Sequence, residues 1–380
     1  MNETPGFLFY LIAFFLVIGP LVFVHELGHY AAGRFFGIKA EAFSIGFGRE
    51  IGGYTDKRGT RWKFGWLPLG GYVRFAGDMN PASQPSPEWL SLPAAERAQT
   101  FQAKPLWQRA IVVAAGPFTN FLVAVLILAA FALAYGELKV PAVAGGIAPN
   151  SPAAAAGLQP GDRFVSIGGR QIETFDDMAA FTSMRSGLAV DIEIIRDGEP
   201  ATVQAVIGRE VRRDRFGNET TRGILGIAPP PRDTFERTPV EWWRAPAVGV
   251  ERTVGLVTMM IDGLGQLILG RVPVSELGGP LRIAKISGES LSLGIENLVM
   301  LAALISINLG FINLLPVPVL DGGHLLFYAV EAVRRKPVEP QVIEWAFRGG
   351  MVAILALMLL VTFNDLGAFG VWRNLAGLIG

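Results

Sequence analysis

The chain has 380 residues, of which 51% are hydrophobic and only 17% are charged, and its mean hydropathy is +0.40. Soluble domains carry about 25% charged residues, so this deficit indicates a membrane protein. Lysine plus arginine balance aspartate plus glutamate at 33 each, and this lack of a basic excess predicts no nucleic-acid partner. The absence of cysteine excludes disulfides and thiol catalysis, so a metal site must use the three histidines and the carboxylates.

Four stretches of the chain are apolar enough to cross a bilayer, which takes about 20 residues. They cover residues 7–24, 107–135, 297–319 and 350–363, and the first continues as a helix to His29. A cleaved signal peptide is not expected there, because no basic residue precedes the apolar run and no small-residue cleavage site closes it. Basic residues gather between the first and second stretches and between the third and fourth. The positive-inside rule therefore places these connections in the cytoplasm and both termini outside it.

The connections differ in composition from the spans. Residues 38–76 alternate aromatic and β-branched residues with glycine, which predicts short strands and turns, and residues 81–93 form a polar, Pro/Ser-rich connector. Residues 140–229 form a separate soluble module, with a short helix that begins at Pro152 and a half-buried strand before the Asp197-Gly198 turn. The predicted fold is an α-helical polytopic membrane protein with about four spanning helices, a membrane-associated β-rich insertion and an inserted α+β domain.

In chain order, seven segments are expected. They are the first spanning helix with a histidine motif (1–36), a cytoplasmic β-rich insertion and linker (37–106), the second spanning helix (107–136), the inserted α+β domain (137–230), a linker with amphipathic segments (231–295), the third spanning helix with a broken end (296–335), and the fourth spanning helix with a C-terminal tail (336–380).

A candidate metal site begins at His25-Glu26-Leu27-Gly28-His29, at the end of the first span. Histidines four residues apart on a helix project from one face and can share a tetrahedral metal ion. Glu26 lies one residue further round, close enough to take a proton from water at the metal without binding the metal, as peptide hydrolysis by water requires. A polar helix end is the structural alternative, but three ionisable side chains at the end of a span are costly and indicate function.

Two histidines leave a catalytic zinc site incomplete, because such sites have three protein ligands. Asp321 and His324 are the candidates for the third ligand, since both follow two prolines, Pro316 and Pro318, that break the third span. Unwound backbone at membrane depth is tolerated only inside protein or beside water. An uncompensated carboxylate there is strongly unfavourable, and a divalent cation offsets that cost.

These motifs resemble the site-2 protease family of intramembrane zinc metalloproteases. The resemblance rests on the histidine motif, on Asn313-Leu-Leu-Pro-Val-Pro-Val-Leu-Asp321-Gly322 in the third span and on the inserted domain. It covers nearly the whole chain and is greatest for the bacterial branch of the regulator of sigma-E protease. It favours Asp321 over His324 as the third ligand.

The resemblance implies one zinc ion (Zn2+) per chain, with His25, His29 and Asp321 as ligands, Glu26 as catalytic base and Asn313 as a residue that holds substrate. The implied substrates are single-span membrane proteins, an anti-sigma factor among them, cut within the lipid bilayer. The implied location is the bacterial inner membrane. The inserted domain would then lie outside the cytoplasm and the zinc site toward the cytoplasmic side.

Two more segments are similar to elements of this family. Gly116-Pro-Phe-Thr-Asn120 in the second span has no chemical role that the sequence reveals, and close helix packing through Gly116 is the alternative to a functional role. In the strand-rich insertion, Gly70, Gly71 and Tyr72 offer an extended edge to which an unwound substrate can add as a strand. The alternative is an ordinary folded cytoplasmic loop.

The inserted domain resembles a PDZ domain, and residues 151–162 are typical of the bacterial type. Gly223, Ile224, Leu225 and Gly226 are similar to the carboxylate-binding loop, in which backbone N–H groups capture a chain terminus. Their place at the end of the module suggests a permuted strand order. The domain is expected either to bind a peptide or C-terminus or to act as a size filter for substrates.

Two functions from other classes stay open. Intramembrane His, Glu and Asp also suit an ion or metal transporter, although four spans and the lack of a visible inverted repeat argue against it. A non-catalytic PDZ membrane scaffold is the second alternative. Glu26 argues against a scaffold, which has no need to keep a catalytic base.

Overall fold

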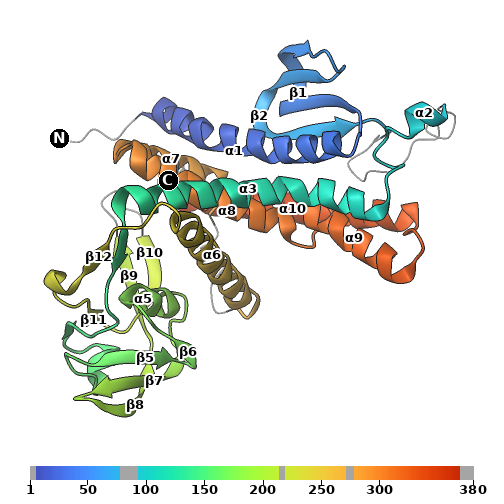
Figure 1. Cartoon of the computed structure of the whole chain (residues 1–380). Coiled ribbons are helices and arrows are strands. Elements are labelled where there is room, and N and C mark those ends of the chain that lie inside the picture. Colours follow the sequence, from blue (N-terminus) through green and yellow to red (C-terminus); the bar gives the residue numbers. More distant parts are fainter. Residues whose placement is uncertain (1–5, 78–92, 214–218, 271–277, 369–380) are drawn as a thin grey trace, which may run out of the picture. The chain divides into compact units, whose positions relative to one another are not determined.

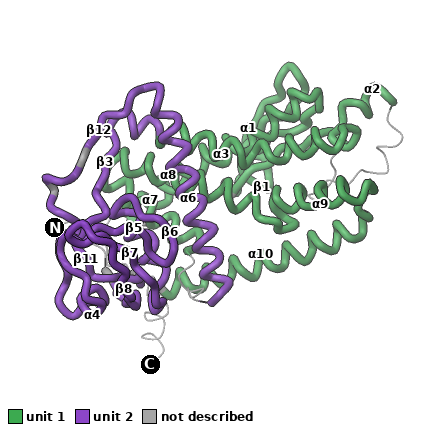
Figure 2. The backbone as a smooth tube through the Cα atoms, turned by 60° about the horizontal axis from the view of Figure 1, so that its bottom comes forward, with its two compact units in different colours: residues 1–128, 277–380 green, residues 129–276 purple. Residues whose placement is uncertain are grey.

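The structure, a computed structural model, describes residues 6–77, 93–213, 219–270 and 278–368. The chain divides into two compact units, which Figure 2 distinguishes by colour. The helical unit comprises residues 1–128 and 277–380, and the strand-rich unit comprises residues 129–276. The connector expected over residues 81–93 lies outside the described residues except for Pro93, and so does the tail beyond residue 368.

Four long apolar helices run through the chain, as the sequence predicts (Figure 1). They are α1 (Phe7–Phe35), α3 (Leu106–Tyr135), α8 (Ile295–Leu314) and α10 (Pro340–Ala368). Within the described ranges, these four are the helices that are long and apolar enough to cross a membrane. Four such helices are consistent with a polytopic membrane protein.

The bounds of two of these helices differ from those of the expected spans. α8 stops at Leu314 rather than near residue 319, because Pro316 and Pro318 lack the N–H groups that a helix needs. α10 begins at Pro340 rather than near residue 350, with a proline at the position where a helix start tolerates it. The added turns carry an i,i+4 ion pair between Glu344 and Arg348.

The helices of the helical unit enclose a small apolar core. α1 packs against α7 (Pro280–Ser292) and α8, and α8 contacts α9 (Asp321–Arg334). Val17 and Leu21 of α1 meet Leu298 of α8 there. Val123 of α3 and Leu291 of α7 pack against the same cluster, so it joins four helices from the two ends of this unit's sequence.

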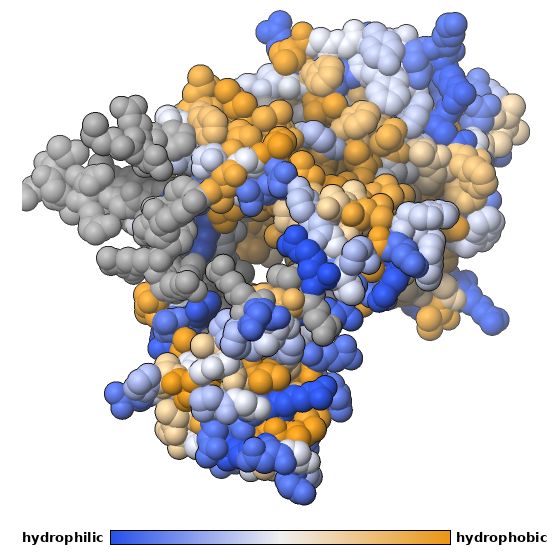
Figure 3. Space-filling model, turned by 60° about the vertical axis from the view of Figure 1, so that its left-hand side comes forward, coloured by the Kyte–Doolittle hydropathy of each residue, from blue (hydrophilic) through white to orange (hydrophobic). Residues whose placement is uncertain are grey.

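Large hydrophobic side chains also cover the outside of these helices. Leu16 of α1, Leu126 of α3 and Leu359 of α10 are 55%, 61% and 73% exposed. Figure 3 shows hydrophobic residues gathered over the helical part of the chain. Soluble monomers rarely expose large continuous apolar surfaces, whereas lipid favours such a surface. The helices therefore have the exterior of a membrane domain.

Between α1 and α3 the chain forms a curled antiparallel hairpin of two strands, β1 (Ala40–Thr55) and β2 (Arg61–Phe75). Residues 42–45 of β1 pair with both ends of β2. Residues 61–64 lie on one side of them and residues 71–74 on the other. The segment 71–74 is thus an edge of the sheet.

The expectation of several short strands in this insertion is wrong in length. The two strands stay continuous because they bend at glycines with positive φ, Gly46, Gly48 and Gly70, where other residues would be strained. The pairing shifts register repeatedly in this region, which increases the local bend and twist. Buried Phe75 and Phe101 then anchor the base of the hairpin next to α3.

The strand-rich unit is built around a four-stranded antiparallel sheet of order β6-β5-β7-β8, with three two-stranded pairs beside it, β9 with β10, β4 with β11 and β3 with β12. Its strands are β3 (Glu137–Lys139), β4 (Gly146–Ile147), β5 (Arg163–Ile167), β6 (Arg170–Gln171), β7 (Ala189–Arg196), β8 (Glu199–Val206), β9 (Gly208–Arg213), β10 (Glu219–Ile224), β11 (Ile227–Ala228) and β12 (Glu236–Thr238). Its helices are α4 (Pro152–Ala155), α5 (Phe175–Ser183), the 3-10 helix η2 (Arg232–Thr234) and α6 (Ala245–Ile268), and the short α2 (Ala94–Arg97) belongs to the helical unit.

Local sequence signals account for two features of the strand-rich unit. Ser151 caps α4 by accepting a hydrogen bond from the Ala154 N–H, and Pro152 is the first helical residue, as predicted. Asp197 and Gly198 turn the chain between β7 and β8 with φ values of 52° and 86°, the positive values that a tight hairpin needs. Both predictions are confirmed.

A buried ion pair closes the end of this sheet. The Asp162 side chain is 1% exposed, and its two oxygens accept hydrogen bonds of 2.7 Å from Arg196. The backbone N–H of Gln159 donates a third bond of 2.8 Å. Burial alone would raise the pKa of Asp162, but these donors outweigh burial and hold that pKa below its usual value.

Candidate metal centre

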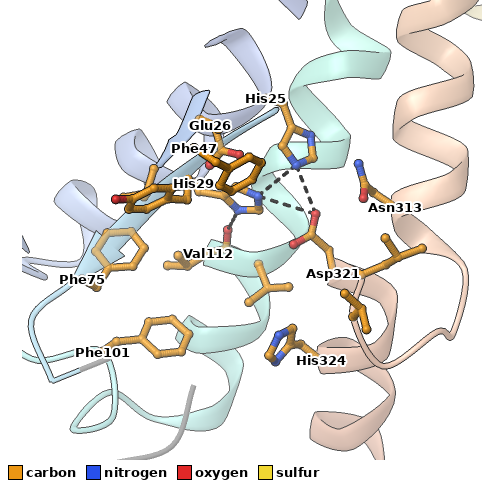
Figure 4. Close-up of a pocket in the computed structure, with 16 residues that line it drawn as sticks. His25, Glu26, His29, Phe47, Phe75, Phe101, Val112, Asn313, Asp321 and His324 are labelled. Atoms are coloured by element: carbon orange, nitrogen blue, oxygen red, sulfur yellow. Dashed lines mark hydrogen bonds and ion pairs between the residues drawn. The ribbon is translucent and has the colours of Figure 1, made fainter. Parts of the chain in front are cut away.

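Two histidines of α1 converge with one carboxylate of α9. One helical turn separates His25 from His29, so both imidazoles project from the same face of α1. The Nε2 atoms of the two rings are 3.2 Å apart, and Asp321 Oδ2 lies 3.3 Å from Nε2 of His25 and 3.5 Å from Nε2 of His29 (Figure 4). The structure thus brings together the three residues that the family resemblance favours as ligands.

The three separations fit a tetrahedral ligand set. Nitrogen and oxygen ligands lie about 2.0–2.1 Å from zinc, which places two tetrahedral ligands about 3.3 Å apart. The side chains of His25, His29 and Asp321 are only 12%, 13% and 19% exposed. Two ring nitrogens and a carboxylate oxygen that converge away from water are a donor set that suits a divalent cation.

His324, the other candidate for the third ligand, lies almost one turn after Asp321 on α9. Its ring packs against Phe347 of α10, with 5.3 Å between the ring centroids. Within the described part of the chain, the group of converging ligand atoms contains Asp321 and leaves His324 out. Figure 4 shows the His324 ring on the wall of the same cavity, away from the three converging atoms.

Glycines allow α1 and α3 to approach closely enough to hold the histidines. A Cβ at Gly28 would lie 2.5 Å from the Ala115 backbone oxygen, whereas a Cβ at Gly19 of the same helix would meet nothing within 4 Å. On α3, a Cβ at Gly116 would lie 2.2 Å from His29 Nε2. The glycine of the histidine motif is therefore required by helix packing, and Gly116 leaves the space that the His29 ring occupies.

The broken helix delivers Asp321 to the site. Pro316 and Pro318 end α8, and Asp321 is the first residue of α9. A Cβ at Gly322 would lie 2.3 Å from the backbone oxygens of Leu314 and Leu315, and a Cβ at Gly323 would collide with the backbone in the same way at Val317. The two glycines after Asp321 therefore let α9 start directly against the broken end of α8.

The ring nitrogens that face away from Asp321 both meet α3. Nδ1 of His29 lies 2.9 Å from the Val112 carbonyl oxygen, and Nδ1 of His25 lies 3.2 Å from the side-chain amide of Asn120. Because the later histidine meets the earlier residue of α3, the two helices run antiparallel. The sequence does not reveal these roles. His25 and His29 are four residues apart, and so are Gly116 and Asn120. This equal spacing is the one sequence signal that could have indicated that the two motifs face each other.

A cavity of about 420 Å³ opens beside the three candidate ligands. Glu26 and Asn313 line it, together with Gly71 and Tyr72 of β2. Four residues that the sequence analysis assigns to catalysis or substrate binding therefore share one cavity with the candidate ligands. Phe47 of β1 also lines it and was not expected.

Glu26 lies between the histidines and the hairpin (Figure 4). Glu26 is 9% exposed, and a Cβ at Gly71 would lie 2.9 Å from Glu26 Cγ. Gly71 thus lets the edge of β2 pass directly over the carboxylate. Gly70 adjoins this edge, where a Cβ would lie 2.6 Å from the Phe47 ring.

The four residues expected to form a carboxylate-binding loop belong to the strand-rich unit. Gly223 and Ile224 lie in β10, paired with Arg209 and Gly208 of β9. The Leu225 side chain is buried in the core of this unit, and Gly226 follows with a φ of 80°. Their role in ligand binding stays a prediction.

The fold and the site together define a polytopic membrane protein with a two-histidine, one-carboxylate candidate metal centre. Residues 13–357 match the sequence model of peptidase family M50. The chain belongs to this family, the site-2 proteases.

Relatives cover nearly the whole chain. A candidate zinc metalloprotease of Agrobacterium fabrum is 45% identical over 368 residues, which cover 96% of this chain and 98% of the relative. Metalloprotease MmpA of Caulobacter vibrioides is 36% identical over 396 residues, which cover 98% of this chain and 99% of that protein. A candidate zinc metalloprotease of Rickettsia conorii is 33% identical, with 94% and 98% covered. The expected family is thereby confirmed.

Proposed function

We propose that this chain is an intramembrane zinc endopeptidase that hydrolyses peptide bonds in or near the spanning segments of single-span membrane proteins. The observation that carries the proposal is the tetrahedral spacing of His25, His29 and Asp321 beside a membrane-length helix, with Glu26 on the same cavity. Membership of a peptidase family and the metalloprotease names of its relatives support the same function. Two nitrogen ligands and one oxygen ligand suit one zinc ion per chain.

In this proposal, Glu26 and Asn313 each have one task in the hydrolysis. When bound, zinc supplies Lewis acidity toward water and toward the scissile carbonyl. Glu26 takes a proton from the attacking water and passes it to the leaving amine as the peptide C–N bond breaks. The Asn313 side-chain amide, on the opposite wall, donates a hydrogen bond to the substrate backbone.

The hairpin edge provides a place for the unwound substrate. A helical substrate hides its peptide bonds in internal hydrogen bonds, so cleavage requires an extended segment. Residues 71–74 form a sheet edge, and three of them, Gly71, Tyr72 and Val73, line the cavity next to Glu26. An added substrate strand would therefore hold its backbone open beside the catalytic base.

The function is tested by cleavage of reconstituted single-span test substrates with and without a zinc chelator. We expect cleavage by the untreated protein, loss of cleavage to background after zinc is removed, and recovery when zinc is added back. Cleavage that persists in protein shown by elemental analysis to be free of metal would contradict the zinc mechanism. If zinc binds but no single-span substrate is cut, metal transport becomes the better proposal.

The finer placement of the chain within the family is also a proposal. The motifs favour the branch of the regulator of sigma-E protease, with an anti-sigma factor as substrate class. Residues 137–230 of the strand-rich unit are proposed to be a PDZ-like domain, supported by their antiparallel sheet and the capped α4. Free C-terminal peptides that compete with cleavage would favour a peptide-binding role, and their failure would favour a size filter.

We further propose that the chain lies in the bacterial inner membrane, with both termini and the PDZ-like domain (residues 137–230) outside the cytoplasm. The basic residues around Lys336 between α9 and α10 support this orientation. The chain has no cysteine, so single exposed cysteines at Lys336 and Glu199 report the topology cleanly. A membrane-impermeant thiol reagent should label Glu199→Cys from outside and Lys336→Cys only after the membrane is opened. The reverse pattern would overturn the orientation.

A further inference from the structure

Asn120 is a fully buried polar residue in the spanning part of α3, and its side-chain amide meets the candidate metal site. Its exposed fraction is 0%, and its amide nitrogen lies 3.2 Å from Nδ1 of His25. The amide oxygen is buried too and has no hydrogen-bond partner among the described residues. The amide can face His25 with its nitrogen or with its oxygen, and no other contact of the oxygen among the described residues favours one of these orientations. The contact with His25 therefore decides between them.

The chemistry of a metal ligand selects the orientation. If Nε2 of His25 faces the metal, it must offer a lone pair, so the proton of the neutral ring sits on Nδ1. An Nδ1–H group needs an acceptor. The amide oxygen of Asn120 accepts, whereas the amide nitrogen can only donate. Oxygen and nitrogen of an amide exchange by a half-turn without a change of shape, and the hydrogen-bond network assigns them.

We propose that Asn120 is a positioning residue: its amide oxygen accepts the Nδ1–H of His25 and fixes the tautomer and the ring orientation in which Nε2 binds the metal. The inference rests on the proposed metal site. Partners of this kind orient metal-binding histidines and raise their basicity.

The other histidine has the same arrangement from a different acceptor. Nδ1 of His29 donates to the Val112 carbonyl oxygen at 2.9 Å. Thus α3 supplies both acceptors, one from its backbone and one from a side chain, while Gly116 between them leaves room for the His29 ring. This assigns a physical role to both ends of the Gly116–Asn120 motif.

A neighbouring helix holds this turn of α3 in place. The Ser306 hydroxyl of α8 donates a buried hydrogen bond of 2.8 Å to the Asn120 backbone carbonyl. That bond ties α8 to the backbone of Asn120 without involving its amide. Ser306→Ala therefore serves as a control that removes a buried hydrogen bond at the same residue and keeps the amide.

The test is the zinc affinity of the full-length apo-protein in detergent, measured by competition with a chelating dye. We expect Asn120→Leu, which is similar in size but offers no acceptor, to bind zinc about 10–100-fold more weakly, the usual cost of losing such a partner. Asn120→Asp keeps an acceptor, so it should retain affinity near that of the wild type. Ser306→Ala should also stay near the wild type.

Thermal unfolding of the apo-proteins separates positioning from general damage. Asn120→Asp buries a charge without metal, so its apo form should unfold earlier while zinc restores its stability. An Asn120→Leu protein that binds zinc as tightly as the wild type, or more tightly, would overturn the inference and leave the proposed function intact. Equal losses of zinc affinity in Asn120→Leu, Asn120→Asp and Ser306→Ala would also overturn the inference, since a purely structural role predicts such equal losses. A wild-type protein that binds no zinc would defeat the proposed metal site itself.

Discussion

Replacement of Glu26 by glutamine is expected to abolish peptide cleavage while one zinc ion per chain remains bound. Glutamine has the shape of glutamate and leaves His25, His29 and Asp321 unchanged, but it cannot take a proton from water. General acid–base catalysis contributes about 10²–10⁴-fold to a rate, so single-turnover cleavage should fall by at least about 100-fold. Cleavage in reconstituted membranes and zinc content by elemental analysis measure the two quantities on one sample.

Glu26→Asp is the matched variant, because it keeps a carboxylate but withdraws it by one methylene. We expect partial activity from it, below the wild type and above Glu26→Gln. If Glu26→Gln still cuts at the wild-type rate, Glu26 is not the base. If it loses zinc together with activity, Glu26 contributes to metal binding and the assigned division of tasks is wrong.

Asp321→Asn is expected to lower zinc affinity by more than about 100-fold, the upper end of the loss seen for partners outside the ligand shell. The carboxylate supplies both a ligand atom and the negative charge of the site, and it lies 3.3 Å and 3.5 Å from the two imidazole nitrogens. Asparagine keeps the volume between Leu320 and Gly322 but provides neither the charge nor a strong zinc ligand. Dye competition on the apo-protein gives the affinity.

His324→Gln is the control for this experiment, since His324 follows on the same helix and lines the same cavity. We expect it to bind zinc with nearly wild-type affinity. The opposite outcome, with zinc retained by Asp321→Asn and lost by His324→Gln, would make His324 the third ligand. It would require α9 to turn so that the ring leaves Phe347 for the metal.

The close packing of α1 on α3 explains residues that look unremarkable in the sequence. Gly28 looks unfavourable inside a helix, where glycine costs about 1 kcal/mol relative to alanine. The Ala115 carbonyl oxygen next to it shows that this cost permits a close approach between helices. Because the two helices pack this closely, α1 presents His25 and His29 and α3 presents the groups that contact the Nδ1 atoms of their rings.

Most of the helical architecture was predictable from local patterns. Hydropathy over about 20 residues identified the four spans, and the spacing of His25 and His29 identified a shared ligand face. Proline identified the break after α8. Each of these signals depends on residues within a few turns of one another, so no knowledge of long-range packing was needed.

The remaining features depended on contacts between distant segments. Residue chemistry left Asp321 and His324 both open as the third ligand, because they share a helix and either side chain can bind zinc, and the family resemblance favoured Asp321. In the structure, the turn of α9 that faces α1 brings Asp321 to the two histidines, and the tight packing of Gly322 and Gly323 on the end of α8 sets that turn. The continuous strands of the hairpin likewise depend on pairing between residues far apart in the chain.

By itself, then, the sequence determined a four-span membrane protein with a two-histidine metal motif and an adjacent base, since hydropathy and helical period are local properties. Only the tertiary structure placed the Asp321 carboxylate within 3.5 Å of both imidazoles and placed α3 against the other nitrogen of each ring. Those placements depend on distances of about 3 Å between helices that are far apart in the sequence, and local patterns carry no information about such distances.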